Sequence, residues 1–459
     1  MILRIPASEF PSRPFQDQDI IDAYDWFMSF ISEKEWLKRK EKIENCISVI
    51  FKPAPSLVDI REGTLIAIRE DQIGWYLYLV YVLQYEPYKY DYWQGARILP
   101  IFKRIGMNLD LVKAIDGIEK KVKHLLRKRP SEADSILFEI LTALLWARNG
   151  WKVKILEERQ SGKTPDLEVS KDEETWQVEC KRQKKTSDYT YRETAKRQIM
   201  ISHISNILMQ HNVLLDIKFH VELVSLPDTY LKEMLETIIP IAKNPGKLLS
   251  TKEMDVDISF VNIKRIRRHL QNYYVKNPSP QLIELIANGT IDSCSSFTSG
   301  AMGDYCYVGD GEANNMYLSD ISNAFGVTCS CDAEESVRAK AKDIKNQIRD
   351  AIGQFSLDTN GIIHIGIETL DGPFVEKERT GKIKNTLKEF DPQNNKLRWI
   401  YIHFFQTYSR SYEDWIIDET VDFASAYINP IPPLEHTYLI IPEEESSMKD
   451  GPHWLRELP

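Results

Sequence analysis

Cysteine is scarce in this sequence, with six residues in a chain of 459. So few thiols cannot staple a disulfide scaffold, and they suit a protein of a reducing compartment. Long apolar runs are also missing, because the most apolar stretch, residues 74–83 (GWYLYLVYVL), is far shorter than the ~20 residues of a membrane span. The N-terminal segment MILRIPASEFPSRPF has no apolar run of the secretory kind. We therefore expect a cytoplasmic protein with no membrane partner.

Several functional motifs are absent as well. The sequence contains no G-x-G-x-x-G, no G-x-x-x-x-G-K-[ST] and no H-E-x-x-H. The absence of a phosphate-binding loop argues against ATP-driven translocation by this chain. The chain also lacks an excess of basic charge, since its net charge is −9 and its pI is about 5.7. The negative net charge argues against a polycation that coats nucleic acid, but it is compatible with a groove that is basic only locally.

Basic residues are nevertheless clustered along the chain. One cluster lies at 120–129 (KKVKHLLRKR), a second at 181–185 continues into 192–197, and a third occupies 264–268 (KRIRR). The ordinary interpretation of each cluster alone is a solvated helix face. Nucleic-acid contacts are the functional alternative, because phosphate groups are bound mainly through such charges.

The first 126 residues are predicted to be largely helical. Apolar residues recur at helical spacing over 17–30 and 32–50, with Ser32 as an N-cap between them. The segment 74–85 is apolar all round, which is typical of a buried helix rather than of a base-stacking surface. We assign residues 1–128 to a helical N-terminal domain.

A second unit begins at Pro130. Ser131 and Asp134 predict a capped helix that ends at Asn149-Gly150. Strands are predicted at 151–156, 166–169 and 175–181, followed by a charged helix over 189–209 and a strand over 215–223. After about residue 225, helix–strand pairs at 333–355 with 361–368 and at 377–390 with 397–405 indicate further α/β structure with parallel strands. The domain ranges are therefore 129–225 for this unit and 226–459 for an α/β C-terminal accessory region.

The segment from Thr164 to Lys185, TPDLEVSKDEETWQVECKRQKK, contains the most informative pattern. Side chains alternate between the faces of a strand, so Glu179 and Lys181 share one face while Cys180 enters the core on the other. If the two strands pair through the SKDEE turn, Asp166 can lie beside Glu179. Two adjacent carboxylates repel each other unless a cation compensates them, and Mg²⁺ accepts carboxylate oxygens readily. Metal, water and a lysine ammonium together meet the needs of phosphodiester hydrolysis.

Pro165-Asp166 followed by Glu179-x-Lys181 resembles the PD-(D/E)xK nuclease superfamily, which includes restriction endonucleases, Holliday-junction resolvases and Mrr-like enzymes. The resemblance covers about residues 131–223. It implies a restriction-endonuclease-like core, formed by a helix, a three-stranded meander, a second helix and a fourth strand. It also implies Mg²⁺-dependent DNA cleavage, in which Mn²⁺ can substitute. Asp166 and Glu179 would be catalytic metal ligands and Lys181 the catalytic lysine. Glu139, in ILFEIL, fits the position of a further ligand, with Glu132 as an alternative on nearly the same helix face.

The residues that follow the hairpin are candidates for contact with DNA. Gln183 shares the face of Lys181, and the basic residues of the second cluster could hold phosphates next to the metal. The candidate nucleic-acid-binding residues are Gln183, Lys184, Lys185, Arg192, Lys196 and Arg197.

The leading hypothesis is thus a divalent-metal-dependent DNA endonuclease, with a restriction or phage-defence role by family analogy. A homodimer is expected because two active sites are needed to cut both strands at once. One alternative is a catalytically inactive module of the same fold that binds nucleic acid or assembles with partners. Another is an interaction protein in which the hairpin pattern is a coincidence of surface charge pairs.

Overall fold

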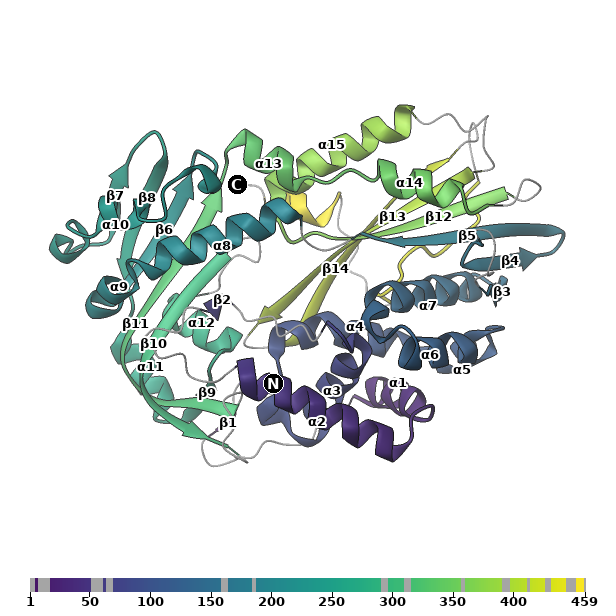
Figure 1. Ribbon diagram of the computed structural model, residues 1–459, viewed down its shortest axis with the longest axis horizontal. Coiled ribbons are helices and arrows are strands. Elements are labelled where there is room, and N and C mark those ends of the chain that lie inside the picture. The colour runs from purple at the N-terminus through teal and green to yellow at the C-terminus, as the bar shows by residue number, and fades with distance from the viewer. Residues whose placement is uncertain are drawn as a thin grey trace.

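The computed structural model describes residues 5–6, 17–50, 61–62, 69–157, 164–183, 187–289, 296–308, 315–355, 360–389, 397–410, 413–425, 431–442 and 451–457. The protein is mixed α/β and contains two mixed sheets, one of six strands and one of eight (Figure 1). Within these ranges, no helix combines the length and the apolar character needed to cross a bilayer.

The N-terminal part of the chain is helical, as expected. Ser32 and Glu35 form a reciprocal cap, in which the Ser32 backbone N–H donates to Glu35 Oε2 at 3.0 Å and the Glu35 N–H donates to Ser32 Oγ at 3.3 Å. The helix over 72–85 is buried on nearly every side, which confirms its assignment to the core. The helices are α1 (Gln18–Met28), α2 (Glu33–Ile50), α3 (Gln72–Tyr85), α4 (Tyr92–Met107), α5 (Leu109–Ala114) and α6 (Ile118–Arg127).

The six-stranded sheet has the order β14-β13-β12-β5-β4-β3. Strands β3, β4 and β5 form an antiparallel meander, while β5, β12 and β13 run parallel to one another. The strands are β3 (Lys152–Ile155), β4 (Leu167–Lys171), β5 (Glu174–Arg182), β12 (Asn360–Glu368), β13 (Leu397–Arg410) and β14 (Glu413–Ser425). Helices α4 and α7 cover one face and α14 and α15 the other (Figure 1); the bounds are α7 (Ala133–Arg148), α14 (Lys345–Ile352) and α15 (Pro373–Glu389).

Residues 215–223 were expected to form the fourth strand beside the meander, and this expectation is wrong. That segment forms β6 (Val213–Phe219), which pairs with β11 and β8 in the other sheet. The neighbour of β5 is instead β12, from the region 226–459, with Glu179 aligned to Ile363 and Lys181 to Ile365. A strand that begins 178 positions after the end of β5 (360 − 182) thus completes the sheet, and β12 is buried along nearly its whole length, as a strand covered on both faces is.

The eight-stranded sheet lies at the left of Figure 1 and is covered by α8 and α9. Its strands are β1 (Ile5–Pro6), β2 (Arg61–Glu62), β6, β7 (Gly246–Ser250), β8 (Met254–Phe260), β9 (Tyr273–Lys276), β10 (Ser296–Tyr307) and β11 (Met316–Cys331). Its helices are α8 (Asp188–Ser202), α9 (Ser205–His211), α10 (Tyr230–Leu235), α11 (Ile263–Leu270) and α12 (Pro280–Ile286), with α13 (Glu334–Lys340) leading back to the six-stranded sheet. Short 3₁₀ turns are η2 (Pro87–Lys89), η3 (Pro130–Glu132), η4 (Leu223–Ser225), η5 (Ile239–Ile241) and η9 (His453–Glu457).

Two predicted helices are each broken in two, and one predicted cap is absent. The helix expected over 189–209 ends at Ser202 and restarts at Ser205, and the one expected over 333–355 is interrupted between α13 and α14. Ser131 lies in η3 and does not cap α7, which has no side-chain cap. Asp134 instead accepts a hydrogen bond from the Tyr76 hydroxyl at 2.5 Å. For Asp134, a contact with a distant segment thus replaces the expected local cap.

Candidate active site

The β4–β5 hairpin brings the proline-aspartate pair to the middle of β5. The register pairs Leu167 with Val178, so Asp166, one residue before β4, falls opposite Glu179. The Cys180 backbone N–H donates to Asp166 Oδ2 at 2.8 Å, which holds the carboxylate against the strand. Period-two alternation and a short turn are enough to produce this placement.

Glu179 and Lys181 lie on the same face of β5, as the alternation predicts. Lys181 Nζ donates to Glu179 Oε1 at 2.6 Å. Glu179 is only 3% exposed, and its second oxygen, Oε2, is buried without a hydrogen-bond partner. A buried carboxylate oxygen in this state is costly unless a further donor or cation approaches it.

Glu139 of α7 lies close enough to Asp166 and Glu179 for their charges to act on it. Its carboxylate forms an ion pair with Lys121 of α6, and both side chains are largely buried, with 13% and 16% of their side-chain surface exposed. Glu132, the alternative to Glu139, lies in η3 and forms an exposed ion pair with Arg129 at 3.3 Å. Of the two glutamates, the structure places Glu139 beside the hairpin residues.

The carboxylates affect one another electrostatically. Burial, followed by the charge of Asp166, raises the pKa of Glu139 to about 8, against the lowering effect of Lys121. The same two causes raise the pKa of Glu179 to about 8, against Lys181. Burial lowers the pKa of Lys181, but Glu179 and Asp166 outweigh it, so the pKa lies above its usual value. This cluster favours any added positive charge.

The carboxylates of this site are only partly suited to hold a hard cation. Among the described residues, no three His, Cys, Asp or Glu side chains are placed as a group that would hold a metal ion. Asp166 and Glu179 are adjacent carboxylates, and one buried oxygen of Glu179 has no hydrogen-bond partner. Mg²⁺ commonly binds through one or two carboxylates together with waters and substrate phosphates. The two hairpin carboxylates therefore fit such an ion, while Glu179 and Glu139 are each also paired with a lysine, Lys181 and Lys121.

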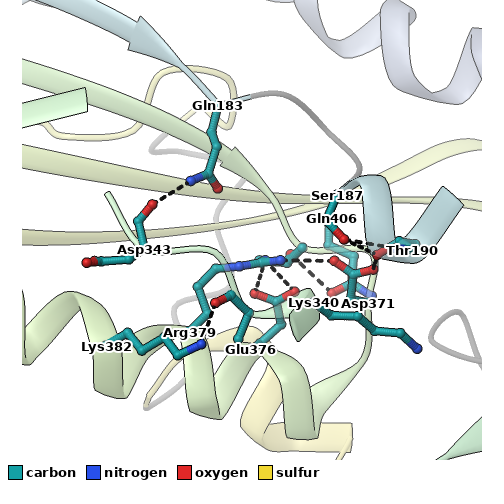
Figure 2. Close-up of polar contacts among 12 residues, drawn as sticks. Gln183, Ser187, Thr190, Lys340, Asp343, Asp371, Glu376, Arg379, Lys382 and Gln406 are labelled. Atoms are coloured by element: carbon teal, nitrogen blue, oxygen red, sulfur yellow. Dashed lines mark hydrogen bonds and ion pairs between the residues drawn. The ribbon is translucent and has the colours of Figure 1, made fainter. Parts of the chain in front are cut away.

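Gln183, expected to face a substrate, is buried in a polar network at the end of β5. Its amide nitrogen donates to the Asp343 carbonyl at 3.1 Å, just before α14 (Figure 2). Figure 2 also shows Arg379 of α15 between Glu376 and Asp371, with Nη1 2.6 Å from Glu376 Oε1 and Nη2 2.9 Å from Asp371 Oδ2. The chain leaves the six-stranded sheet after Arg182 and comes back to it through α14, which follows Asp343. The Gln183–Asp343 hydrogen bond therefore links the two connecting segments.

None of the described basic residues that were expected to bind DNA has a contact with the site residues. Lys184 and Lys185 lie outside the described residues. Helix α8 packs against α10, η4 and α13, not on the six-stranded sheet. On it, Arg192 covers the ring of Tyr189, Lys196 pairs with Asp228 at 2.5 Å and Arg197 donates to Thr194 Oγ1 at 3.4 Å. Their role in DNA binding stays a prediction.

Lys121 is the residue at this site that the sequence analysis missed, because it was included in a cluster interpreted as a solvated helix face. Helical spacing could have found it. Lys121 follows Ile118 by three residues and precedes Leu125 by four, and both are buried. It therefore lies on the inward face of α6, whereas Lys120 and Lys123 are exposed.

Neither the protein-family models, nor the curated proteins, nor the solved structures include a match to this chain. The assignment of function therefore depends on the geometry of the residues alone.

Proposed function

We propose that the protein is a divalent-metal-dependent DNA endonuclease whose active site contains Asp166, Glu179 and Lys181. The observation that carries the proposal is the pairing of Asp166 with Glu179, whose buried Oε2 has no hydrogen-bond partner, directly beside the Lys181 ammonium. An exposed hairpin with ordinary cross-strand charge pairs would leave these groups in water, yet Glu179 is 3% exposed.

The element order supports a restriction-endonuclease-like core in the six-stranded sheet. Helix α7, the β3–β5 meander, helix α14 and strand β12 follow the expected order of helix, meander, helix and strand. Helix α14 packs on β5 and β12, so it takes the place that was expected for the helix at 189–209. The segment between Gln183 and Asp343, with most of the eight-stranded sheet, would be an insertion into this core.

The residues have distinct roles in this proposal. Asp166 and Glu179 would hold a Mg²⁺ or Mn²⁺ ion, which when bound polarises the phosphoryl group and acidifies a water molecule. The Lys181 ammonium, fixed by Glu179, would face the negative charge that develops on the phosphate. Cys180 holds Asp166 in position through its backbone N–H. Since cutting both strands together needs two such sites, we expect the protein to act on duplex DNA as a homodimer.

The test is a cleavage assay on supercoiled plasmid, linear duplex, branched DNA, single-stranded DNA and RNA, with Mg²⁺ or Mn²⁺ and an EDTA control. Asp166→Asn and Lys181→Met should each lower the cleavage rate at least 100-fold, since both act on the charge of the reacting phosphate. Lys152→Met, at an exposed position of β3, is the matched control and should cleave as wild type does. DNA binding without cleavage of any substrate would favour the inactive binding module instead.

A further inference from the structure

Lys121 adds a positive charge to the carboxylate cluster formed by Asp166, Glu179 and Glu139. It comes from a helix that precedes the nuclease-like unit in the sequence. The side chain comes from α6, in the N-terminal helical part, and its ammonium pairs with Glu139 while also interacting with Asp166. We propose that Lys121 is a built-in second cation, so that the site takes one divalent metal ion, at Asp166 and Glu179, and not two. This inference rests on the nuclease function proposed above.

Backbone bonds fix Lys121 at this place. Just before α6, the Asp116 N–H donates to the Val153 carbonyl at 3.3 Å, and the Ile155 N–H donates to the Asp116 carbonyl at 2.9 Å. These bonds attach the chain to β3 as a short parallel bridge. Gly117 follows with φ +85°, and the Lys121 N–H then donates to the Gly117 carbonyl at 3.0 Å. The first turn of α6 is thus anchored to the sheet that carries the site.

The count of charges supports a single ion. Asp166, Glu179 and Glu139 can carry three negative charges, and Lys121 and Lys181 offset two of them. Two-metal nuclease sites hold their ions about 3.5–4 Å apart and need several carboxylates to share between them. Here Glu139, the carboxylate needed for a second ion, is paired with the Lys121 ammonium, which comes from a helix outside the hairpin, so the three carboxylates are accompanied by two lysines. One divalent ion, with waters and a substrate phosphate to complete its shell, matches the two remaining carboxylates.

A purely structural ion pair is the competing explanation. It would make Lys121 important for stability but irrelevant to the number of ions bound. Lys121 acts through Glu139 as a positioning residue, so the distinguishing measurement is metal stoichiometry and not activity. Lys120 offers a matched control, because it lies on the same helix and forms an exposed ion pair with Glu157.

The experiment counts Mn²⁺ ions per chain in the absence of DNA, by titration calorimetry and by the paramagnetic resonance signal of free Mn²⁺. Wild type, Lys120→Met and Lys121→Arg should each bind one ion. Lys121→Met should bind two, because Glu139 is released as a ligand, and adding Glu139→Gln to it should restore one. Circular dichroism and thermal unfolding check that each variant is folded.

A further variant keeps the inference testable if Lys121→Met does not fold. Glu139→Gln alone should still bind one ion, whereas Asp166→Asn should bind none. Two ions on wild type, one ion on folded Lys121→Met, or loss of the ion from Glu139→Gln would each overturn the inference but leave a metal site in place. No ion on wild type would overturn the proposed metal-dependent function, and the inference with it.

Discussion

Glu376 illustrates at the scale of one residue how this protein buries charge. Its carboxylate is 1% exposed and shares the Arg379 guanidinium with Asp371. Burial raises the pKa of Glu376 to about 7, although Arg379 acts against it. The network in Figure 2 therefore contains a group that is easier to protonate in the folded chain than in the unfolded one.

The raised pKa of Glu376 makes the folded protein less stable as the pH rises. The folded state binds more protons than the unfolded state between the unfolded pKa of Glu376, about 4.5, and its folded value of about 7. The contribution of Glu376 to the free energy of unfolding is therefore present below pH 4.5 and is lost as the pH rises to about 7. The loss is about 3 kcal/mol at most, at 1.36 kcal/mol per pKa unit.

Urea unfolding of wild type and Glu376→Gln at pH 5 and pH 8 measures this difference. The variant should lose less stability than wild type between the two pH values, because its amide does not titrate. Glu389→Gln, at an exposed position of the same helix, should show the wild-type pH dependence. Equal pH slopes for wild type and Glu376→Gln would contradict the expectation.

At the scale of elements, α6 depends on the turn that precedes it. Gly117 adopts φ +85°, and a Cβ there would meet the Ile155 carbonyl oxygen at 3.2 Å. Gly117→Ala should lower the free energy of unfolding by about 1–2 kcal/mol, because both the backbone conformation and the close approach disfavour a side chain. Because this turn positions Lys121, the variant should also let a second Mn²⁺ ion bind, as Lys121→Met does.

The matched control is Gly381→Ala in α15. A Cβ at Gly381 would meet nothing within 4 Å, and the position lies inside a helix. Alanine there should raise the free energy of unfolding by about 0.5–1 kcal/mol, because it is the better helix former. Chemical denaturation of both variants gives the comparison, and a stabilised Gly117→Ala protein would refute the importance of the turn.

The ends of two helices were not predictable from the usual helix-ending residues. No glycine or proline marks the break between α8 and α9, but Ser202 and Ser205 donate through their hydroxyls to the carbonyls of Ile199 and Ser202. Such side-chain bonds bend or interrupt a helix. Between α13 and α14, Lys382 of α15 binds the Ala341 carbonyl at 2.9 Å. That partner lies 41 residues away, so the local sequence around 341 does not reveal it.

At the scale of the whole molecule, Lys276 joins the two halves of the chain. It ends β9 in the eight-stranded sheet, and its ammonium donates to the Tyr90 carbonyl at 2.7 Å, just before α4. Burial lowers the pKa of Lys276 to about 7, with Asp91 acting against it, and burial raises the pKa of Asp91 to about 6. The junction therefore depends on two buried groups that compensate each other.

Lys276→Met should lower the free energy of unfolding by about 3 kcal/mol between the pKa of Asp91, about 6, and that of Lys276, about 7, because it leaves the Asp91 carboxylate buried without its cation. The cost should be smaller at pH 5, where Asp91 takes up a proton more easily. Adding Asp91→Asn should recover part of the loss, since the two residues interact. Lys264→Met, at an exposed position of α11, is the control for removing a lysine, and an equal effect of both variants would contradict this account.

The sequence by itself determined the hairpin at the candidate site. Asp166, Glu179 and Lys181 are separated by one short turn, and the alternation of side chains along a strand decides which of them meet. Helix α7 and its end at Asn149-Gly150 were predictable for the same reason, since the signal is local and Gly150 adopts the φ of +76° that glycine favours. Local periodicity also identified α3 as buried.

Only the tertiary structure decided what surrounds that hairpin. The pairing of β5 with β12 and the arrival of Lys121 from α6 join segments that are distant in the sequence. No local pattern encodes such contacts, because many apolar strands compete for the same sheet edge and only burial of the whole chain selects among them. The same selection buried Gln183, which strand alternation alone had directed toward a substrate.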